Sequence, residues 1–153
     1  MSVIVDGLSY PEGPCFDDAG VLHFVELSGQ VVSRVVDGRR EVLAEVGGAP
    51  NGAAFDDAGT LWWCNNGGNW GPNASNGMRA GLGGGPGLIQ RLEPDGTVTD
   101  VVMDLSSPND LVFDVDGGLW FTDPVWATRD ATGSAPASAS PPGTVCFYDG
   151  ATV

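Results

Sequence analysis

Hydrophobic and polar positions follow the same order at three places in this chain. In the clearest copy, residues 107–124, a polar head precedes an apolar run, an acidic turn that contains glycine, and a second apolar run. Two short β-prone runs joined by an Asp/Gly turn predict a β-hairpin. The same unit begins at Pro11 and at Pro50, and its second apolar run ends at Glu26 and at Asn65. We therefore expect three equivalent hairpins.

The three copies keep a fixed spacing once one insertion is removed. Phe16 and Phe55 are 39 residues apart, whereas Phe55 and Phe113 are 58 apart. The additional 19 residues match a Gly- and Asn-rich segment at 69–87, and removing it restores the period. Repeats of this length, made of strands and Gly/Asp turns, are typical of β-propeller blades, each a four-stranded sheet around a central channel. The pattern predicts an all-β propeller fold.

Further β-prone runs complete about three predicted blades within one domain, residues 1–153. These runs lie at 3–8, 31–36, 41–46, 88–92, 97–103 and 144–148. The blades span 3–47, 50–104 (with the insert 69–87) and 107–153, and the third has no fourth strand. Because propellers close with 4–8 blades, we expect an incomplete ring.

An incomplete ring leaves strand edges unpaired, and such edges favour association. Two arrangements follow. In the favoured one, the chain is part of a longer protein. In the other, two copies form one ring as a homodimer, with the edges at 3–8 and 144–148 paired between copies.

Charge and composition exclude several classes of function. The chain has 20 acidic and 6 basic residues, a net charge of −14, and no lysine. Because nucleic-acid binding requires a basic surface, we expect no nucleic-acid partner. No apolar run approaches the ~20 residues of a membrane helix, and the first residues do not resemble a signal peptide. We therefore expect no membrane partner and a cytoplasmic location.

Cysteine and histidine give little indication of chemistry. Cys15, Cys64 and Cys146 are odd in number and lie one per repeat inside apolar runs. This placement favours buried reduced thiols over a disulfide framework or a metal site. His23 is the single histidine and lies between apolar residues of a predicted strand, which favours a structural imidazole over a catalytic triad.

Two sets of polar residues recur at equivalent positions of the three copies. Glu12, Asn51 and Asn109 stand at the start of each first strand, and Glu26, Asn65 and Asp123 stand at the end of each second strand. A hairpin brings these two ends together, so we expect both sets at one mouth of the channel. Either the residues cap strand starts, or their oxygens converge on a hard cation such as Ca²⁺, which takes 6–8 oxygen ligands. No soft ligand recurs, which disfavours zinc and copper.

Five short motifs occur in a specific order. They are S-Y-P-E-G-P at 9–14, P-N-G at 50–52, C-N-N-G-G at 64–68, S-P-N-D at 107–110 and W-F-T-D-P at 120–124. In this combination the chain resembles the gluconolactonase/regucalcin-like (senescence marker protein) family, over nearly all of its length and about the N-terminal half of the family's fold. The resemblance implies a six-bladed propeller and a Ca²⁺-dependent lactonase. It also implies that two further ligands, one of them the proposed general base, would fall beyond Val153.

The resemblance also implies roles for individual residues. It makes Glu12 and Asn109 metal ligands, and it places Asn51 in the substrate site. Glu26 stands where the family usually has Asp.

Other candidates come from their position near the predicted mouth. Asn65 and Asp123 join Asn51 as candidate substrate-binding residues, and Trp70, on a loop beside the mouth, is a candidate apolar wall. Asp110 and Asp123 are the acidic groups nearest the mouth, which makes them candidate catalytic residues.

The expected function is hydrolysis of a small-molecule sugar lactone. The cation would polarise the lactone carbonyl and activate water, and a carboxylate would accept the proton. Two alternatives remain open. In the first, the substrate is an aryl ester or a phosphotriester. In the second, the chain is a non-catalytic Ca²⁺-binding or assembly module.

Overall fold

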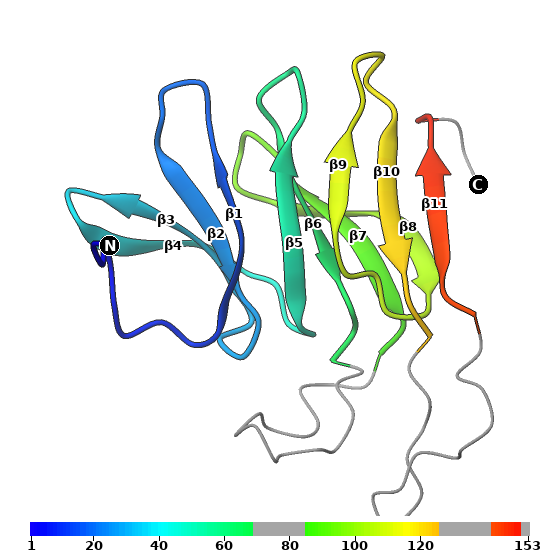
Figure 1. Cartoon of the computed structure of the whole chain (residues 1–153), viewed down its shortest axis with the longest axis horizontal. Helices are drawn as coiled ribbons and strands as arrows, with labels where there is room; N and C mark the ends of the chain where they lie inside the picture. Colours follow the sequence, from blue (N-terminus) through cyan, green and yellow to red (C-terminus); the bar gives the residue numbers. More distant parts are fainter. Residues whose placement is uncertain (69–84, 126–141, 151–153) are drawn as a thin grey trace, which may run out of the picture.

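The structure is a computed structural model that describes residues 1–68, 85–125 and 142–150. This part of the chain contains eleven strands and no helix, and the strands form three antiparallel sheets (Figure 1). The first sheet contains β1 (Pro11–Phe16), β2 (Leu22–Glu26), β3 (Val31–Val36) and β4 (Arg39–Glu45). The second contains β5 (Pro50–Phe55), β6 (Leu61–Asn65), β7 (Gly87–Leu92) and β8 (Val98–Leu105). The third contains β9 (Leu111–Phe113), β10 (Leu119–Asp123) and β11 (Thr144–Tyr148).

The all-β class predicted from the sequence is confirmed. Strands pair in chain order within every sheet. The strands predicted at 31–36 and 144–148 have those bounds, and the other strands outside the hairpins differ by one or two residues at their ends. The β-prone run at 3–8 is not a strand, so that expectation was wrong. Gly7 interrupts the run with φ +72°, and Val3 and Ile4 are exposed.

An aspartate organises the turn of each first hairpin. In the second sheet, Asp56 Oδ1 accepts the backbone N–H of Thr60 at 2.8 Å, and its Oδ2 accepts the indole N–H of Trp62 at 2.9 Å. In the third sheet, Asp114 accepts the N–H of Gly118 at 2.9 Å and the indole N–H of Trp120 at 2.7 Å. These side-chain bonds replace part of the backbone turn and fix the register of the hairpin.

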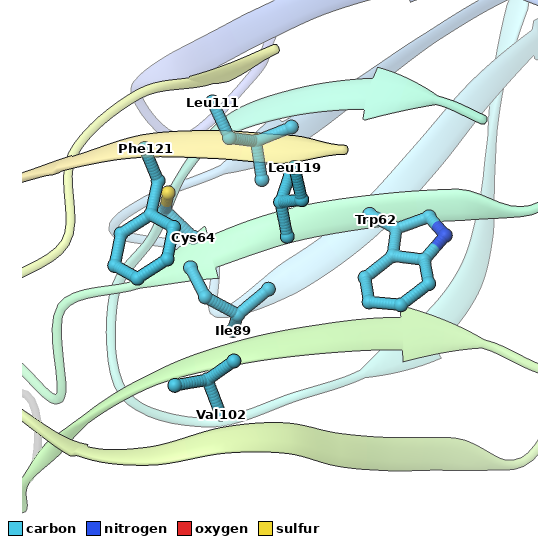
Figure 2. Close-up of a cluster of buried hydrophobic side chains, with 7 residues drawn as sticks. All are labelled: Trp62, Cys64, Ile89, Val102, Leu111, Leu119 and Phe121. Carbon is cyan, nitrogen blue, oxygen red and sulfur yellow. The ribbon is translucent and has the colours of Figure 1, made fainter. Parts of the chain in front are cut away.

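Apolar side chains hold neighbouring sheets face to face. Val25 and Val32 of the first sheet pack against Leu61 and Trp63 of the second. A larger cluster joins the second sheet to the third, and Figure 2 shows its side chains from both sheets converging: Trp62, Cys64, Ile89, Val102, Leu111, Leu119 and Phe121. Because a sheet must bury its apolar face, these two clusters fix the order of the sheets.

The first strands of the three sheets lie side by side, as β1, β5 and β9 do in Figure 1. A Cβ atom added at Gly13 would lie 2.5 Å from the backbone nitrogen of Ala53, so β1 approaches β5 more closely than a side chain allows. Gly52 donates its N–H to the carbonyl oxygen of Asn109 at 2.7 Å, which joins β5 to the segment before β9. The starts of the three first strands therefore form one continuous surface.

Candidate functional site

A polar pocket of about 310 Å³ lies where the first strands of the three sheets begin. Its walls are Glu12, Gly13, Pro14, Asn51, Gly52, Ala53, Asn109 and Asp110. Every wall residue comes from a first strand or from the two residues that precede β9. The repeat thus brings equivalent positions of the three sheets to one place.

The structure brings together the first of the two predicted polar sets. Glu12, Asn51 and Asn109 all line this pocket. Glu12 and Asn109 are half-buried, whereas Asn51 is 7% exposed. Asp110, predicted as a catalytic candidate, also lines the pocket and is exposed at its edge.

Irregular pairing of the first strands gives these side chains their positions. In β1, pairing with β2 shifts register between Glu12 and Cys15, and in β5 the corresponding shift lies between Pro50 and Ala53. Such bulges bend a strand and redirect a side chain, and they are frequent beside active sites. Gly13, with φ +55°, supplies the left-handed conformation in β1.

The pocket contains side-chain oxygens that no described residue binds. Within the described residues, the side chains of Glu12, Asn51 and Asn109 make no hydrogen bond. Asp110 uses Oδ1 to accept the N–H of Leu111 at 3.0 Å. Carboxylate and amide oxygens are the ligands that Ca²⁺ prefers. These residues therefore fit a hard cation.

Soft or histidine-rich metal chemistry has no support in the described part of the chain. There, no group of three or more His, Cys, Asp or Glu side chains is placed to hold a metal ion. A cation bound in this pocket would depend on the asparagine amides and on further ligands such as water.

The second predicted polar set does not line the pocket. Its members, Glu26, Asn65 and Asp123, are buried at the ends of β2, β6 and β10, and each accepts backbone N–H groups from the segment that leads into its own sheet. Asp123 accepts from Ser106 at 3.0 Å and from Ser107 at 2.6 Å. Asn65 accepts from Ala49 at 2.9 Å and from Gly67 at 3.1 Å.

Glu26 makes the same kind of contact and adds an ion pair. Its Oε2 accepts the N–H of Ser9 at 2.8 Å, and its Oε1 accepts the hydroxyl of Ser33 at 2.9 Å and pairs with Arg40. The three side chains are thus occupied in holding the start of each sheet in place. For this set the structure agrees with the capping interpretation, and neither Asn65 nor Asp123 lines the pocket.

The remaining predicted site residue, Trp70, lies outside the described residues. His23 is buried, with Nδ1 3.0 Å from the carbonyl oxygen of Val21, and it does not line the pocket. This agrees with the structural role predicted for the imidazole.

The cysteines are free thiols, as predicted, but only Cys64 is fully buried, whereas Cys15 and Cys146 are half-buried. Burial, and then the negative charges of Asp110 and Asp123, raise the pKa of Cys64 well above its ordinary 9.0. Cys64 is therefore a neutral thiol at physiological pH and is neither a nucleophile nor a thiolate ligand.

Sequence reasoning missed the backbone part of the site. Gly13 and Gly52 line the pocket because only glycine permits the close approach of the first strands. The available signal was a glycine directly after the polar residue inside a β-prone run, which is typical of a bulge or a close backbone approach.

Solved structures show what this arrangement resembles. A gluconolactonase from Xanthomonas campestris matches with a TM-score of 0.67 and 28% identity, over 94% of this chain and 45% of that protein. A second structure, provisionally described as a gluconolactonase, matches with a TM-score of 0.67 and 23% identity, over 98% of this chain and 49% of that protein. The resemblance to the gluconolactonases is confirmed.

This chain spans about half the length of the two gluconolactonase structures that it matches. A virginiamycin B lyase from Staphylococcus aureus also matches, with a TM-score of 0.59 and 19% identity, over 94% of this chain and 42% of the lyase. At that identity the lyase supports the fold alone, which is all-β and β-propeller-like. A scan against protein-family models found no match, and a search of curated proteins also found none.

Among residues 1–68, 85–125 and 142–150 there is no helix with the length and apolarity that crossing a lipid bilayer requires.

Proposed function

We propose that this chain carries the Glu12/Asn51/Asn109 part of the active site of a calcium-dependent sugar-lactone hydrolase on a six-bladed propeller. One observation carries the proposal. Three side chains with unused oxygens, from three successive sheets, meet in one polar pocket of a chain that resembles gluconolactonases. No buried side-chain oxygen or nitrogen of the described residues lacks a partner, so the unpaired oxygens of this pocket are open to water and to a ligand that replaces it.

Glu12 and Asn109 would hold the cation, and Asn51 would face the substrate. A bound Ca²⁺ supplies a Lewis acid for the lactone carbonyl and lowers the pKa of a water molecule. The carboxylate of Glu12 contributes the negative charge that retains the ion. The amide of Asn51, which is 7% exposed, would donate a hydrogen bond to a substrate hydroxyl or carbonyl oxygen.

Asp110, the second carboxylate of this pocket beside Glu12, would accept a proton. It lies at the exposed edge of the wall, where the N–H of Leu111 orients its Oδ1 and its Oδ2 makes no hydrogen bond to the described residues. A general base needs this combination of orientation and access to the substrate.

Proton release from D-glucono-1,5-lactone, with and without a calcium chelator, tests the proposal. We expect chelation to abolish hydrolysis above the uncatalysed rate. Glu12→Gln removes the charge but keeps the shape, and it should lower the rate at least about tenfold, the equivalent of about 1.4 kcal/mol. Glu45→Gln, at an exposed position of β4, is the matched control and should hydrolyse the lactone like the wild type.

Calcium binding measured by calorimetry gives a readout that does not depend on turnover. Glu12→Gln should weaken Ca²⁺ binding, and Glu45→Gln should not. Full lactonase activity in the presence of the chelator would refute the metal mechanism. An aryl ester hydrolysed faster than the lactone would instead favour the alternative substrate class.

A further inference from the structure

A network of side-chain hydrogen bonds crosses the second sheet, from the surface of β8 to the backbone that enters β5. Gln90 donates from Nε2 to Asp100 Oδ1 at 2.7 Å. Gln90 Oε1 accepts Nδ2 of Asn65 at 2.9 Å and the indole N–H of Trp63 at 3.0 Å. Asn65 Oδ1 accepts the backbone N–H of Ala49 at 2.9 Å. Asp100 is exposed and the other side chains of the network are buried, so the network connects the surface with the interior.

The two ends of this network determine the direction of every bond in it. An ionised carboxylate accepts hydrogen bonds and donates none, so Gln90 must turn its NH₂ group to Asp100. An indole N–H only donates, so the side-chain oxygen of Gln90 must face Trp63. Asn65 must then point its own NH₂ group at that oxygen, which leaves its Oδ1 for the N–H of Ala49. A donor in place of Asp100 would therefore disturb every bond of the network.

The backbone that Asn65 binds leads directly into the pocket. Ala49 stands two residues before Asn51, and Pro50 between them is the Cα partner of Asn65 in the pairing of β5 with β6. The register shift of β5 begins at Pro50 and includes Asn51. A Cβ atom added at Gly48 would clash with Asn65 Oδ1, so the amide fits closely against this segment. The position of Asn51 in the pocket thus depends on the orientation of the Asn65 amide.

The first sheet has an equivalent network with opposite charges. Glu26 stands at the position of Asn65 in the repeat. Its carboxylate accepts the hydroxyl of Ser33 at 2.9 Å and pairs with Arg40 of the outer strand β4. Ser33 is equivalent to Gln90, because each pairs with the residue two positions before Glu26 or Asn65. In both sheets, therefore, an outer-strand residue complements the side chain that holds the incoming backbone.

We propose that Asp100 and Gln90 are positioning residues for Asn51. Through Asn65 they hold the backbone that places the Asn51 amide in the pocket, although neither of them lines the pocket. This positioning role rests on the proposed function in one respect, because it takes Asn51 as a substrate-binding residue.

A charge exchange within the network tests this role. Asp100→Lys replaces an acceptor by a donor, and Gln90→Glu puts a second carboxylate beside Asp100, so each single variant should break the network. In the double variant the introduced lysine donates to the introduced glutamate, which still accepts the N–H groups of Trp63 and Asn65. The double variant should therefore restore what each single variant loses, which misfolding of either single variant would not predict.

Two further variants calibrate the exchange. Asp100→Ala removes the acceptor without introducing a donor, so it should produce the same changes as Asp100→Lys at smaller size. Glu45→Lys is the matched control, because Glu45 is an exposed carboxylate on the outer strand β4 and its substitution changes the charge by the same amount. It should behave like the wild type.

Lactone kinetics and NMR provide independent readouts. We expect each single variant of the exchange to raise the KM for D-glucono-1,5-lactone about three- to tenfold, the effect of one lost hydrogen bond, and the double variant to reverse the rise. Ca²⁺ affinity, measured by calorimetry, should change less, because Glu12 and Asn109 lie outside the second sheet. The NMR signals of the Asn51 side-chain amide should shift and the Ala49 N–H should exchange faster in the single variants, and both should return in the double variant.

The NMR readout separates this role from the proposed function. A wild-type chain that does not hydrolyse the lactone would refute the proposed function, whereas Asn51 signals that follow the charge exchange would still support the positioning role. Single variants with wild-type KM and unchanged Asn51 signals would overturn it. So would a double variant as impaired as the single ones, or a loss of stability in urea that leaves Asn51 undisturbed, because Asp100 and Gln90 would then act on the fold alone.

Discussion

The backbone N–H of Gly52 donates a hydrogen bond to the carbonyl oxygen of Asn109, with an N···O distance of 2.7 Å. The bond ties the start of β5 to the residues before β9, directly under the polar pocket. A Cβ atom added at Gly52 would lie 2.7 Å from the Cα of Asp110 and 2.9 Å from the carbonyl oxygen of Asn109. The width of the pocket between Asn51 and Asn109 therefore depends on this glycine.

Gly52→Ala should force the second and third sheets apart at the pocket. Overpacking against rigid backbone costs about 1–3 kcal/mol, so we expect the free energy of unfolding to fall by that amount. Ca²⁺ binding should weaken as well, because the oxygens of Asn51 and Asn109 would separate. Urea unfolding and calorimetry measure the two effects.

Gly85→Ala is the control for replacing a glycine by alanine without a steric clash. A Cβ atom at Gly85 would meet no atom of the described residues within 4 Å, and the φ of Gly85 is not in the left-handed region, so the change should alter stability by less than about 0.5 kcal/mol. Gly52→Ala with wild-type stability and Ca²⁺ affinity would show that the first strands are not held as closely as the structure indicates.

Asp123→Ala should lower the free energy of unfolding. The substitution removes the carboxylate that accepts the backbone N–H groups of Ser106 and Ser107 where the chain enters the third sheet. At about 1–3 kcal/mol for each of the two hydrogen bonds lost, we expect the free energy of unfolding to fall by about 2–6 kcal/mol. Asp57→Ala, in an exposed turn, should be nearly neutral. An Asp123 variant that keeps wild-type stability but loses lactone hydrolysis would support the catalytic role first considered for this residue.

The strand pattern and the first polar set could be predicted because both depend on the repeat. Alternation of apolar and polar residues determines which positions share a face, and the period determines which positions are equivalent. This was enough to place Glu12, Asn51 and Asn109 at one end of neighbouring sheets, where the structure also has them.

The second set shows where sequence reasoning reaches its limit. Pro11 pairs with Glu26 and Pro50 pairs with Asn65, so these residues lie at the predicted end of their sheets. Their side chains nevertheless turn inward to backbone N–H groups, because the segment entering each sheet has donors that must be satisfied. The period of the repeat predicts where a strand ends, but it does not predict which group the last side chain of that strand will bind. The bulges of β1 and β5 were missed for a similar reason, since alternation assumes regular pairing.

Two cysteines should react slowly in the folded protein. Burial, and secondarily the negative charge of Asp17, raise the pKa of Cys15 from 9.0 to about 11, so at pH 8 its thiolate fraction should be roughly a hundredfold lower than in the unfolded chain. Cys64 is buried and its pKa is also raised. A thiol-reactive chromogenic reagent should therefore modify both residues at least tenfold faster in denaturant. Fast labelling of Cys15 at pH 8 in the folded chain would contradict the burial of this side chain.

Asp114 should make the free energy of unfolding depend on pH in the acid range. The hydrogen bond from the Trp120 indole, and then that from the Gly118 backbone, lower the pKa of Asp114 below its ordinary 3.8. A carboxyl group with a lower pKa in the folded state contributes stability above its unfolded pKa and loses that contribution as pH falls through its folded pKa. The contribution is therefore complete at neutral pH and disappears below pH 3.8.

Asp114→Asn should accordingly reduce the free energy of unfolding at neutral pH and have less effect as the pH falls below 3.8. The amide of the variant can still accept the Gly118 N–H, but it lacks the negative charge and the second acceptor that the Trp120 indole uses. Asp116→Asn is the control, because the Asp116 side chain makes no hydrogen bond to the described residues. Urea unfolding at neutral and acid pH measures the difference between wild type and each variant. A deficit for Asp114→Asn that stays constant from neutral to acid pH would mean that the charge of this turn does not stabilise the hairpin.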